Sequence, residues 1–131
     1  MLLDTSGLLA LIDPREPQHE RAVELYDAAV VRLTHTYVLA ELVALCSSRK
    51  LPRLPVLKLS RRLLDDADVE LTHVEEALHR RALDLLDARP DKTYSLCDAV
   101  SFVLMRERGE NEALTTDRHF EQEGFARLLA P

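Results

Sequence analysis

The sequence predicts an α/β protein in which helices surround a parallel sheet. Short apolar segments alternate with longer segments of helical periodicity, which is the pattern of consecutive βα units. The chain has 131 residues, of which 47% are hydrophobic and 31% charged, as expected for one globular domain spanning residues 1–131. There is no internal repeat or low-complexity linker that would divide it.

The first half of the chain is expected to begin with a short strand over residues 1–4. Ser6 is expected to cap a helical turn that stops before Asp13-Pro14, because proline disfavours helix in the residue before it. Pro17 opens the next expected helix, whose apolar residues recur at helical spacing. The elements expected next are a strand at 32–34 and a helix at 36–47.

In the second half, Pro52 and Pro55 precede a basic amphipathic helix that ends near Asp65. Thr72-His73-Val74-Glu75 has the pattern of a capping box and predicts a helix from there to about Arg89. The remaining expected elements are strands at 69–71, 113–116 and 127–129 and a helix from Ser95 to about Glu107 that stops at Gly109.

Three acidic residues stand alone in apolar segments, namely Asp4, Glu41 and Asp98. Segments this apolar are expected to be buried on most sides, and a buried carboxylate without a partner is costly. Each has a purely structural alternative. Asp4 would cap the first helix, Asp98 would close a capping box with Ser95, and Glu41 would pair with an arginine or face solvent.

Asp117 follows the strand expected at 113–116, as Asp4 follows the first strand. The carboxyl ends of neighbouring parallel strands open into one crevice, although a turn aspartate is the simpler reading of Asp117 alone. Two carboxylates about 4 Å apart repel by roughly 4 kcal/mol at an effective dielectric constant of ~20, so four together call for a cation. An all-oxygen site favours Mg²⁺, or Mn²⁺, over zinc.

The other metal-binding residue types lack the spacing of a site. The five histidines form no H-x-x-x-H or H-E-x-x-H pattern and are expected at the surface or at helix caps. Cys46 and Cys97 form no C-x-x-C pattern and are expected to be buried and reduced. With no nucleotide-binding loop, the chemistry that fits such a site best is metal-dependent hydrolysis of phosphodiester bonds.

Four segments together resemble the PIN domain, and most closely the bacterial and archaeal VapC-type toxins. They are Asp4-Thr5-Ser6-Gly7, Glu41 in its apolar helix, residues 91–99 and residues 114–120. The resemblance extends over essentially the whole chain. It implies a Rossmann-like three-layer α/β/α sandwich and a Mg²⁺- or Mn²⁺-dependent endoribonuclease. It further implies a homodimer that is inhibited by an antitoxin protein.

The resemblance also assigns roles to individual residues. Asp4 and Asp98 are expected to be the principal metal ligands, and Glu41 and Asp117 are expected to complete the catalytic acidic pocket. Ser6 and Thr116 match positions that support the acids by hydrogen bonds, although both residue types also cap chain ends. Two other functions remain open: a PIN-fold nuclease acting in RNA maturation or on DNA, and a catalytically silent binding module.

The charge distribution offers a candidate RNA contact. The net charge is −6, yet the segment from Arg49 to Arg62 is basic and contains no acidic residue. Arg49, Lys50 and Arg53 are therefore expected to contact RNA or a partner protein, while core packing of this helix is the alternative. No segment has the length of a membrane span and no signal peptide is recognisable, so we expect a cytoplasmic protein.

Overall fold

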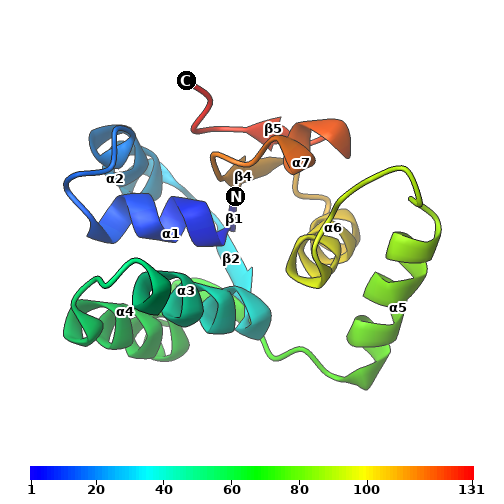
Figure 1. The fold of residues 1–131 in the computed structure, drawn as a ribbon, viewed down its shortest axis with the longest axis horizontal. Coiled ribbons are helices and arrows are strands. Elements are labelled where there is room, and N and C mark those ends of the chain that lie inside the picture. The colour runs from blue at the N-terminus through cyan, green and yellow to red at the C-terminus, as the bar shows by residue number, and fades with distance from the viewer.

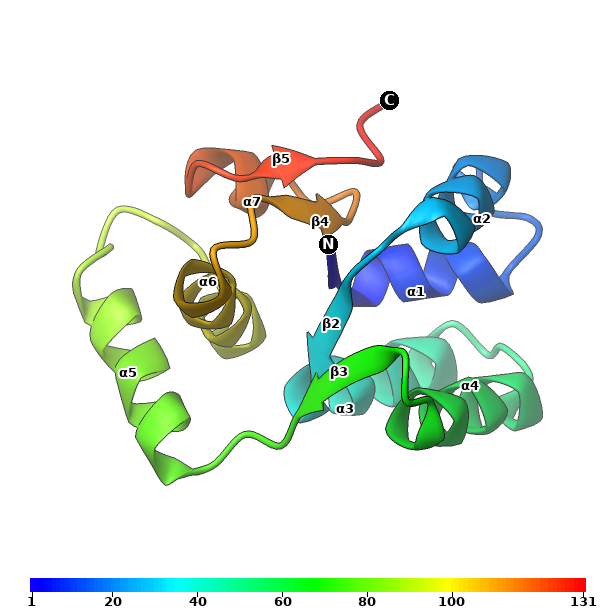
Figure 2. The same ribbon diagram turned by 180° about the vertical axis from the view of Figure 1, so that it is seen from behind.

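The computed structural model describes all residues, 1–131, and contains a five-stranded sheet in the order β3-β2-β1-β4-β5 (Figures 1 and 2). All four pairs of neighbouring strands are parallel, as predicted. The strands are β1 (Leu2–Leu3), β2 (Arg32–His35), β3 (Val69–Thr72), β4 (Glu112–Leu114) and β5 (Ala126–Arg127). The first strand is very short and lies at the centre of the sheet.

Helices cover both faces of the sheet, which confirms the three-layer sandwich. In Figure 1, α1 to α4 lie on one side of the sheet, and α5 and α6 lie on the other. None of the helices is both long and apolar enough to cross a membrane. The helices are α1 (Thr5–Ile12), α2 (His19–Ala28), α3 (Thr36–Ser48), α4 (Arg53–Asp65), α5 (Glu76–Asp87), α6 (Leu96–Arg108) and α7 (Arg118–Gln122).

Each face of the sheet has its own apolar core, because successive side chains of a strand point to opposite faces. Leu3 packs into the core beneath α1 to α4, and Leu2 packs into the core beneath α6 and α7. Phe102 on α6 and Phe120 on α7 are fully buried in the second core. The two cores fix α1, α6 and α7 against the central strands.

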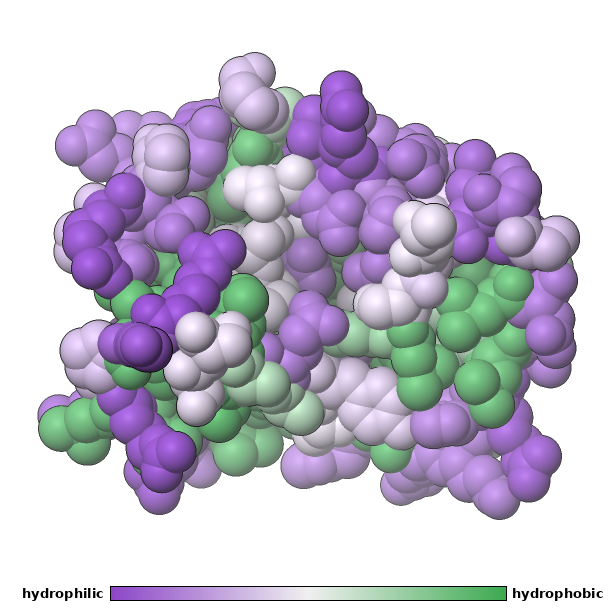
Figure 3. Space-filling model, in the orientation of Figure 1, coloured by the Kyte–Doolittle hydropathy of each residue, from purple (hydrophilic) through white to green (hydrophobic).

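Parts of the protein surface are hydrophobic. In Figure 3, hydrophobic side chains gather at the lower left, over α3 and α4, and at the right, over α5. Leu54 and Leu64 on α4 and Leu83 on α5 are exposed large hydrophobic residues. The basic helix α4 is therefore partly core, through buried Val56 and Leu63, and partly an exposed apolar surface.

Two expected helix caps are wrong. Ser6 lies inside α1, which begins at Thr5 with Asp4 as its N-cap residue. The pattern at Thr72–Glu75 forms no capping box, because Thr72 continues β3 by pairing with His35 and α5 begins only at Glu76. The cap predicted at Ser95 is confirmed, and the helix that it opens ends at Gly109, which has a positive φ of 64°.

Candidate active site

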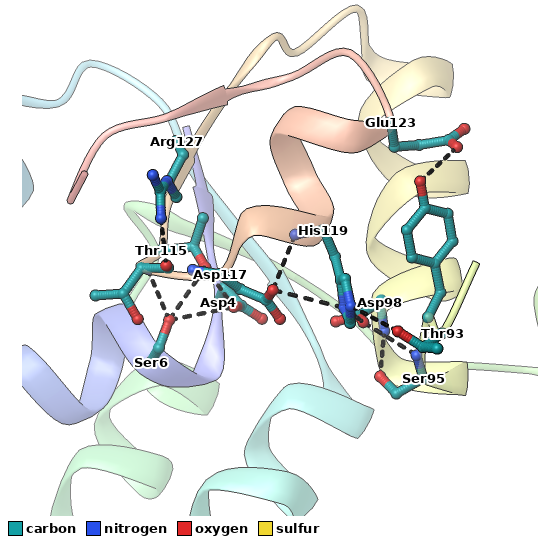
Figure 4. A network of polar contacts seen from close by, with 12 residues as sticks. Asp4, Ser6, Thr93, Ser95, Asp98, Thr115, Asp117, His119, Glu123 and Arg127 are labelled. Carbon is teal, nitrogen blue, oxygen red and sulfur yellow. Dashed lines mark hydrogen bonds and ion pairs between the residues drawn. The ribbon is translucent and has the colours of Figure 1, made fainter. Parts of the chain in front are cut away.

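The four acidic residues predicted to form a site come from four different elements. Asp4 follows β1 and is the N-cap residue of α1, and Asp117 follows β4 and is the N-cap residue of α7. Because β1 and β4 are parallel neighbours, both residues leave the sheet at its carboxyl edge. Asp98 lies in the first turn of α6, and Glu41 lies on α3. Figure 4 shows the carboxylates of Asp4, Asp117 and Asp98 in one row.

Asp4 is a buried carboxylate, with 4% of its surface exposed. Thr115 Oγ1 donates a hydrogen bond to Asp4 Oδ2 at 2.7 Å, and Ser6 Oγ donates to the same oxygen at 3.4 Å. Burial raises the pKa of Asp4 to about 7, although the hydrogen bond from Thr115 lowers it, and the charges of Asp98 and Glu41 raise it further. A charged Asp4 is therefore unfavourable at neutral pH unless a cation is near.

The hydroxyl that supports Asp4 belongs to Thr115, not to the predicted Thr116. We predicted a strand that continues through Thr116, but β4 ends at Leu114. Whether Thr115 or Thr116 points inward depends on the residue at which the strand ends. Thr115 is fully buried and Thr116 is exposed. Thr116 still contributes its backbone N–H, which donates to Ser6 Oγ at 3.0 Å. Ser6 and Thr115 thus link α1 to the end of β4, with 3.0 Å between their hydroxyl oxygens.

Asp98 combines the two roles that the sequence offered for it. It closes the capping box of α6, since the Ser95 N–H donates to Asp98 Oδ2 and the Asp98 N–H donates to Ser95 Oγ, both at 3.0 Å. Only 5% of its surface is exposed. The capping box therefore holds the carboxylate in place at the site instead of competing with a role there.

The expectation that the histidines lie at the surface or at helix caps is confirmed for exposed His73 and for His35, the N-cap residue of α3, but it missed the place of His119. His35 is fully buried at the end of β2, where its Nε2 is 2.8 Å from Ser101 Oγ, and burial lowers its pKa to about 3. His119 lies within the acidic row, with Nδ1 2.9 Å from Asp98 Oδ2 and 3.5 Å from Asp117 Oδ1. The signal that could have identified His119 is its position two residues after an aspartate that precedes a helix.

Glu41 was expected to be buried on most sides, but it is exposed on α3. It is nevertheless close enough to the site that its charge raises the pKa of Asp4. Cys97, on α6, lies near the same acids. Burial, and then the charges of Glu41, Asp4 and Asp98, raise the pKa of the Cys97 thiol. A thiol with a raised pKa stays protonated and is a poor nucleophile. Both cysteines are free and buried, as predicted.

The predicted basic contact lies away from the acids, at the far end of α3. Arg49 follows Glu41 by eight residues, which corresponds to about 12 Å along a helix. Its guanidinium forms an ion pair with Glu16 at 3.1 Å. Lys50, which has a positive φ of 56°, and Arg53, in the first turn of α4, are both exposed. None of these three residues forms a hydrogen bond or ion pair with any of the four predicted site acids.

A buried carboxylate that the sequence did not reveal is that of Glu123, just after α7. Its side chain is 3% exposed and forms ion pairs with Arg89 at 3.0 Å and with Arg106 at 2.6 Å. The Tyr94 hydroxyl also donates to it, at 3.1 Å. Burial raises the pKa of Glu123, but the hydrogen bonds from both arginines outweigh this, so the pKa is lowered overall. The network ties α7 to the segment that precedes α6, and so fixes His119 relative to Asp98.

The donor set of this site fits a divalent cation. One ligand atom from each of Asp98, Asp117 and His119 lies within 4.8 Å of the others. Asp4 adds a carboxylate whose pKa is raised by its burial and by the neighbouring charges, and a cation would relieve that repulsion. The N-termini of α1, α6 and α7 also point their partial positive charge towards this edge.

Comparisons with known proteins agree with this geometry. A family model described as PIN domain matches residues 1–125. The 23S rRNA-specific endonuclease VapC20 of Mycobacterium tuberculosis, from two strains, is 31% identical over 129 residues, which cover 98% of this chain and 97% of that protein. The crystal structure of M. tuberculosis VapC20, described as a Sarcin-Ricin loop cleaving toxin, aligns with a TM-score of 0.88 and 28% identity over 98% of both chains.

Proposed function

Because the chain belongs to the PIN-domain family, we propose that it is a divalent-metal-dependent endoribonuclease that hydrolyses RNA phosphodiester bonds. The observation that carries the proposal is the convergence of Asp4, Asp98 and Asp117 at one edge of the sheet. The raised pKa of Asp4 supports it, since natural folds keep a destabilising buried carboxylate where its charge is used. The similarity to VapC20 extends over nearly the whole chain.

In this proposal Asp4 and Asp98 are the principal ligands of Mg²⁺ or Mn²⁺, and Glu41 and Asp117 complete the catalytic pocket. When bound, the cation supplies positive charge for the phosphoryl oxygens and lowers the pKa of water. Ser6 and Thr115 hold Asp4 in place through their hydroxyls, and Ser95 holds Asp98 through its backbone N–H. These hydrogen bonds hold Asp4 and Asp98 close to their working positions before RNA binds.

The substrate that we propose is a structured ribosomal RNA loop. VapC20 is described as specific for 23S rRNA and as cleaving the Sarcin-Ricin loop. The test is incubation of the purified protein with 23S rRNA and with a synthetic Sarcin-Ricin hairpin, in Mg²⁺, in Mn²⁺ and in EDTA. We expect one defined cut in either cation and none in EDTA. Cleavage that persists in EDTA and in Asp98→Asn would refute the proposal.

The same experiment separates the alternatives. A DNA hairpin of the same sequence and a precursor RNA distinguish a DNA nuclease or a maturation enzyme from a ribosomal RNA nuclease. Uptake of the cation without cleavage of any of these substrates would favour a silent binding module. A set of four mutually repelling acids has no evident use in such a module, which is why we place it last.

The basic segment gives a prediction for RNA binding. We expect that changing Arg49, Lys50 and Arg53 together to glutamine weakens RNA binding and lowers the salt slope of the binding constant by about 2, at roughly 0.7 per lost phosphate contact. Binding should be measured in an Asp98→Asn background, so that the RNA stays intact. The control replaces exposed Arg21, Arg80 and Arg81 on α2 and α5. An unchanged slope would assign the segment to protein contacts instead.

We also propose that the protein is the toxin of a toxin–antitoxin pair and forms a homodimer. The apolar surface on α4 supports a protein partner, because Leu54 and Leu64 are exposed there. Beside it, a cavity of about 270 Å³ is lined by residues from the end of α1 and the start of α4, Ile12 and Val56 among them. Co-purification with the product of an adjacent small gene tests the antitoxin. The mass of the free protein in solution tests the homodimer.

A further inference from the structure

The imidazole of His119 lies among the acids, where the family resemblance supplies no role for it. We propose that His119 Nδ1 is a ligand of the divalent cation together with Asp98 and Asp117, and that this nitrogen gives the site a preference for Mn²⁺ over Mg²⁺. The proposal rests on the proposed metal-dependent function and assigns one further ligand and the identity of the cation.

The first argument is the position of the nitrogen. His119 Nδ1 is 2.9 Å from Asp98 Oδ2 and 3.5 Å from Asp117 Oδ1, and the three ligand atoms lie within 4.8 Å of one another. Three donors at such separations can all reach one cation with small side-chain movements, since bonds to divalent ions measure about 2.0–2.3 Å. Figure 4 shows the imidazole beside both carboxylates, with dashed lines marking these contacts.

The second argument is the partner of the other ring nitrogen. His119 Nε2 is 3.2 Å from Thr93 Oγ1, in the segment before α6. Metal-binding histidines almost always donate the N–H of their second nitrogen to an oxygen, which fixes the tautomer and the ring orientation. In this structure Nδ1 is within hydrogen-bond distance of Asp98 Oδ2. When a cation replaces that contact, Nε2–H would donate to Thr93 and keep the ring in the same orientation.

The third argument is that the three donors are held from several sides. The backbone N–H of His119 donates to Asp117 Oδ1 at 2.9 Å, and the Tyr94 ring packs edge-on against the imidazole with 5.3 Å between ring centroids. Asp98 is held by the Ser95 N–H. The side chain of His119 is 24% exposed, so it lines the site without being sealed from a cation or substrate.

The preference for Mn²⁺ follows from ligand chemistry. Mg²⁺ is a hard cation that binds oxygen and keeps its waters, so an imidazole nitrogen adds little to its affinity. Divalent transition metals bind nitrogen readily, with affinities that rise along the series from Mn²⁺. Replacing one carboxylate oxygen of an acidic site by a nitrogen therefore shifts its selectivity away from Mg²⁺.

The direct test is electron spin-echo modulation of Mn²⁺ bound to the full chain. We expect modulation from ¹⁴N in the wild-type protein, replaced by the ¹⁵N pattern when histidine alone is ¹⁵N-labelled, a comparison that needs no mutation. In His119→Asp, which keeps an oxygen ligand at this position, the modulation should disappear. His73→Asn, at an exposed residue after β3, is the matched control and should keep it.

Titration calorimetry with Mg²⁺ and with Mn²⁺ gives the second readout. We expect the ratio of the two dissociation constants to move towards Mg²⁺ by about tenfold in His119→Asp, and Mn²⁺ affinity to fall by about tenfold in Thr93→Val. If Mn²⁺ binds but shows no histidine nitrogen, His119 is only a hydrogen-bond partner of Asp98 and the proposal is overturned, with the nuclease function untouched. If no cation binds, the metal centre itself is refuted.

Discussion

Asp4→Asn is expected to abolish metal-dependent RNA cleavage and, in the metal-free protein, to raise the free energy of unfolding. Loss of a principal metal ligand should reduce the cleavage rate roughly 10³-fold or more. The gain in stability has a different origin. Burial raises the pKa of Asp4 to about 7, and the charges on Asp98 and Glu41 add to it. The charged residue that catalysis requires is thus a cost to the fold.

The pH dependence gives this prediction its direction. The folded metal-free protein holds a proton on Asp4 up to about pH 7, whereas the unfolded chain releases it near pH 3.9. Stability is therefore lost as the pH rises between these values, by roughly 4 kcal/mol in total. Asparagine removes the loss but buries an amide NH₂ in place of a carboxylate oxygen, which costs about 2 kcal/mol. A net gain of about 2 kcal/mol should remain at pH 8.

The measurement is thermal unfolding from pH 4 to pH 8 in EDTA, beside cleavage assays in Mn²⁺. Asp4→Asn should flatten the pH profile of the wild-type protein and raise Tm at pH 8 by about 6–10 °C. Added cation should raise the Tm of the wild-type protein and not that of the variant. Asp84→Asn, at an exposed residue of α5, is the matched control. A variant that cleaves RNA, or whose stability still falls with pH as in the wild type, would contradict the assignment of Asp4.

Asp4 and Asp117 show how far the sequence can predict such a site. Each follows an apolar strand, and adjacent parallel strands necessarily bring their ends together, so pattern alone placed both acids at one edge. Asp98 was predictable for a related reason, since its spacing from Ser95 located the start of a helix. Glu41 was predictable as a site residue but not as an exposed one, because an apolar helix segment does not reveal which face meets solvent.

The residues that escaped prediction depend on register and on tertiary contacts. From the sequence, either Thr115 or Thr116 could donate a hydrogen bond to Asp4. The residue at which β4 ends determines that Thr115 does so. His119 has no metal-binding motif, because its partners lie on separate elements of the chain. Glu123 lies in a polar segment, and it is buried because the fold brings Arg89 and Arg106 against it. The one local signal among these residues is the position of His119 two residues after Asp117.

Gly7→Ala is expected to lower the free energy of unfolding by about 3 kcal/mol or more, although alanine favours helix by about 1 kcal/mol. Gly7 lies in the first turn of α1, where the helix touches β4. A Cβ atom at this position would lie 2.0 Å from the carbonyl oxygen of Leu114 and 2.7 Å from its carbonyl carbon. Backbone atoms of a central strand cannot move aside as a side chain can, so α1 itself would have to shift.

The shift would reach the site, which makes the prediction specific. The same Leu114 oxygen accepts the Asp4 N–H at 3.2 Å, and Ser6 meets Thr115 beside it. Gly7→Ala should therefore weaken cation binding as well as stability, both measurable by calorimetry and urea unfolding. Gly109→Ala and Gly124→Ala are the controls, with positive φ but no atom within 4 Å of the added Cβ, and should cost only about 1 kcal/mol. If Gly7→Ala stabilises the protein, as it would in an exposed helix, then α1 does not pack on β4 as described, and the geometry of Asp4 must be redrawn.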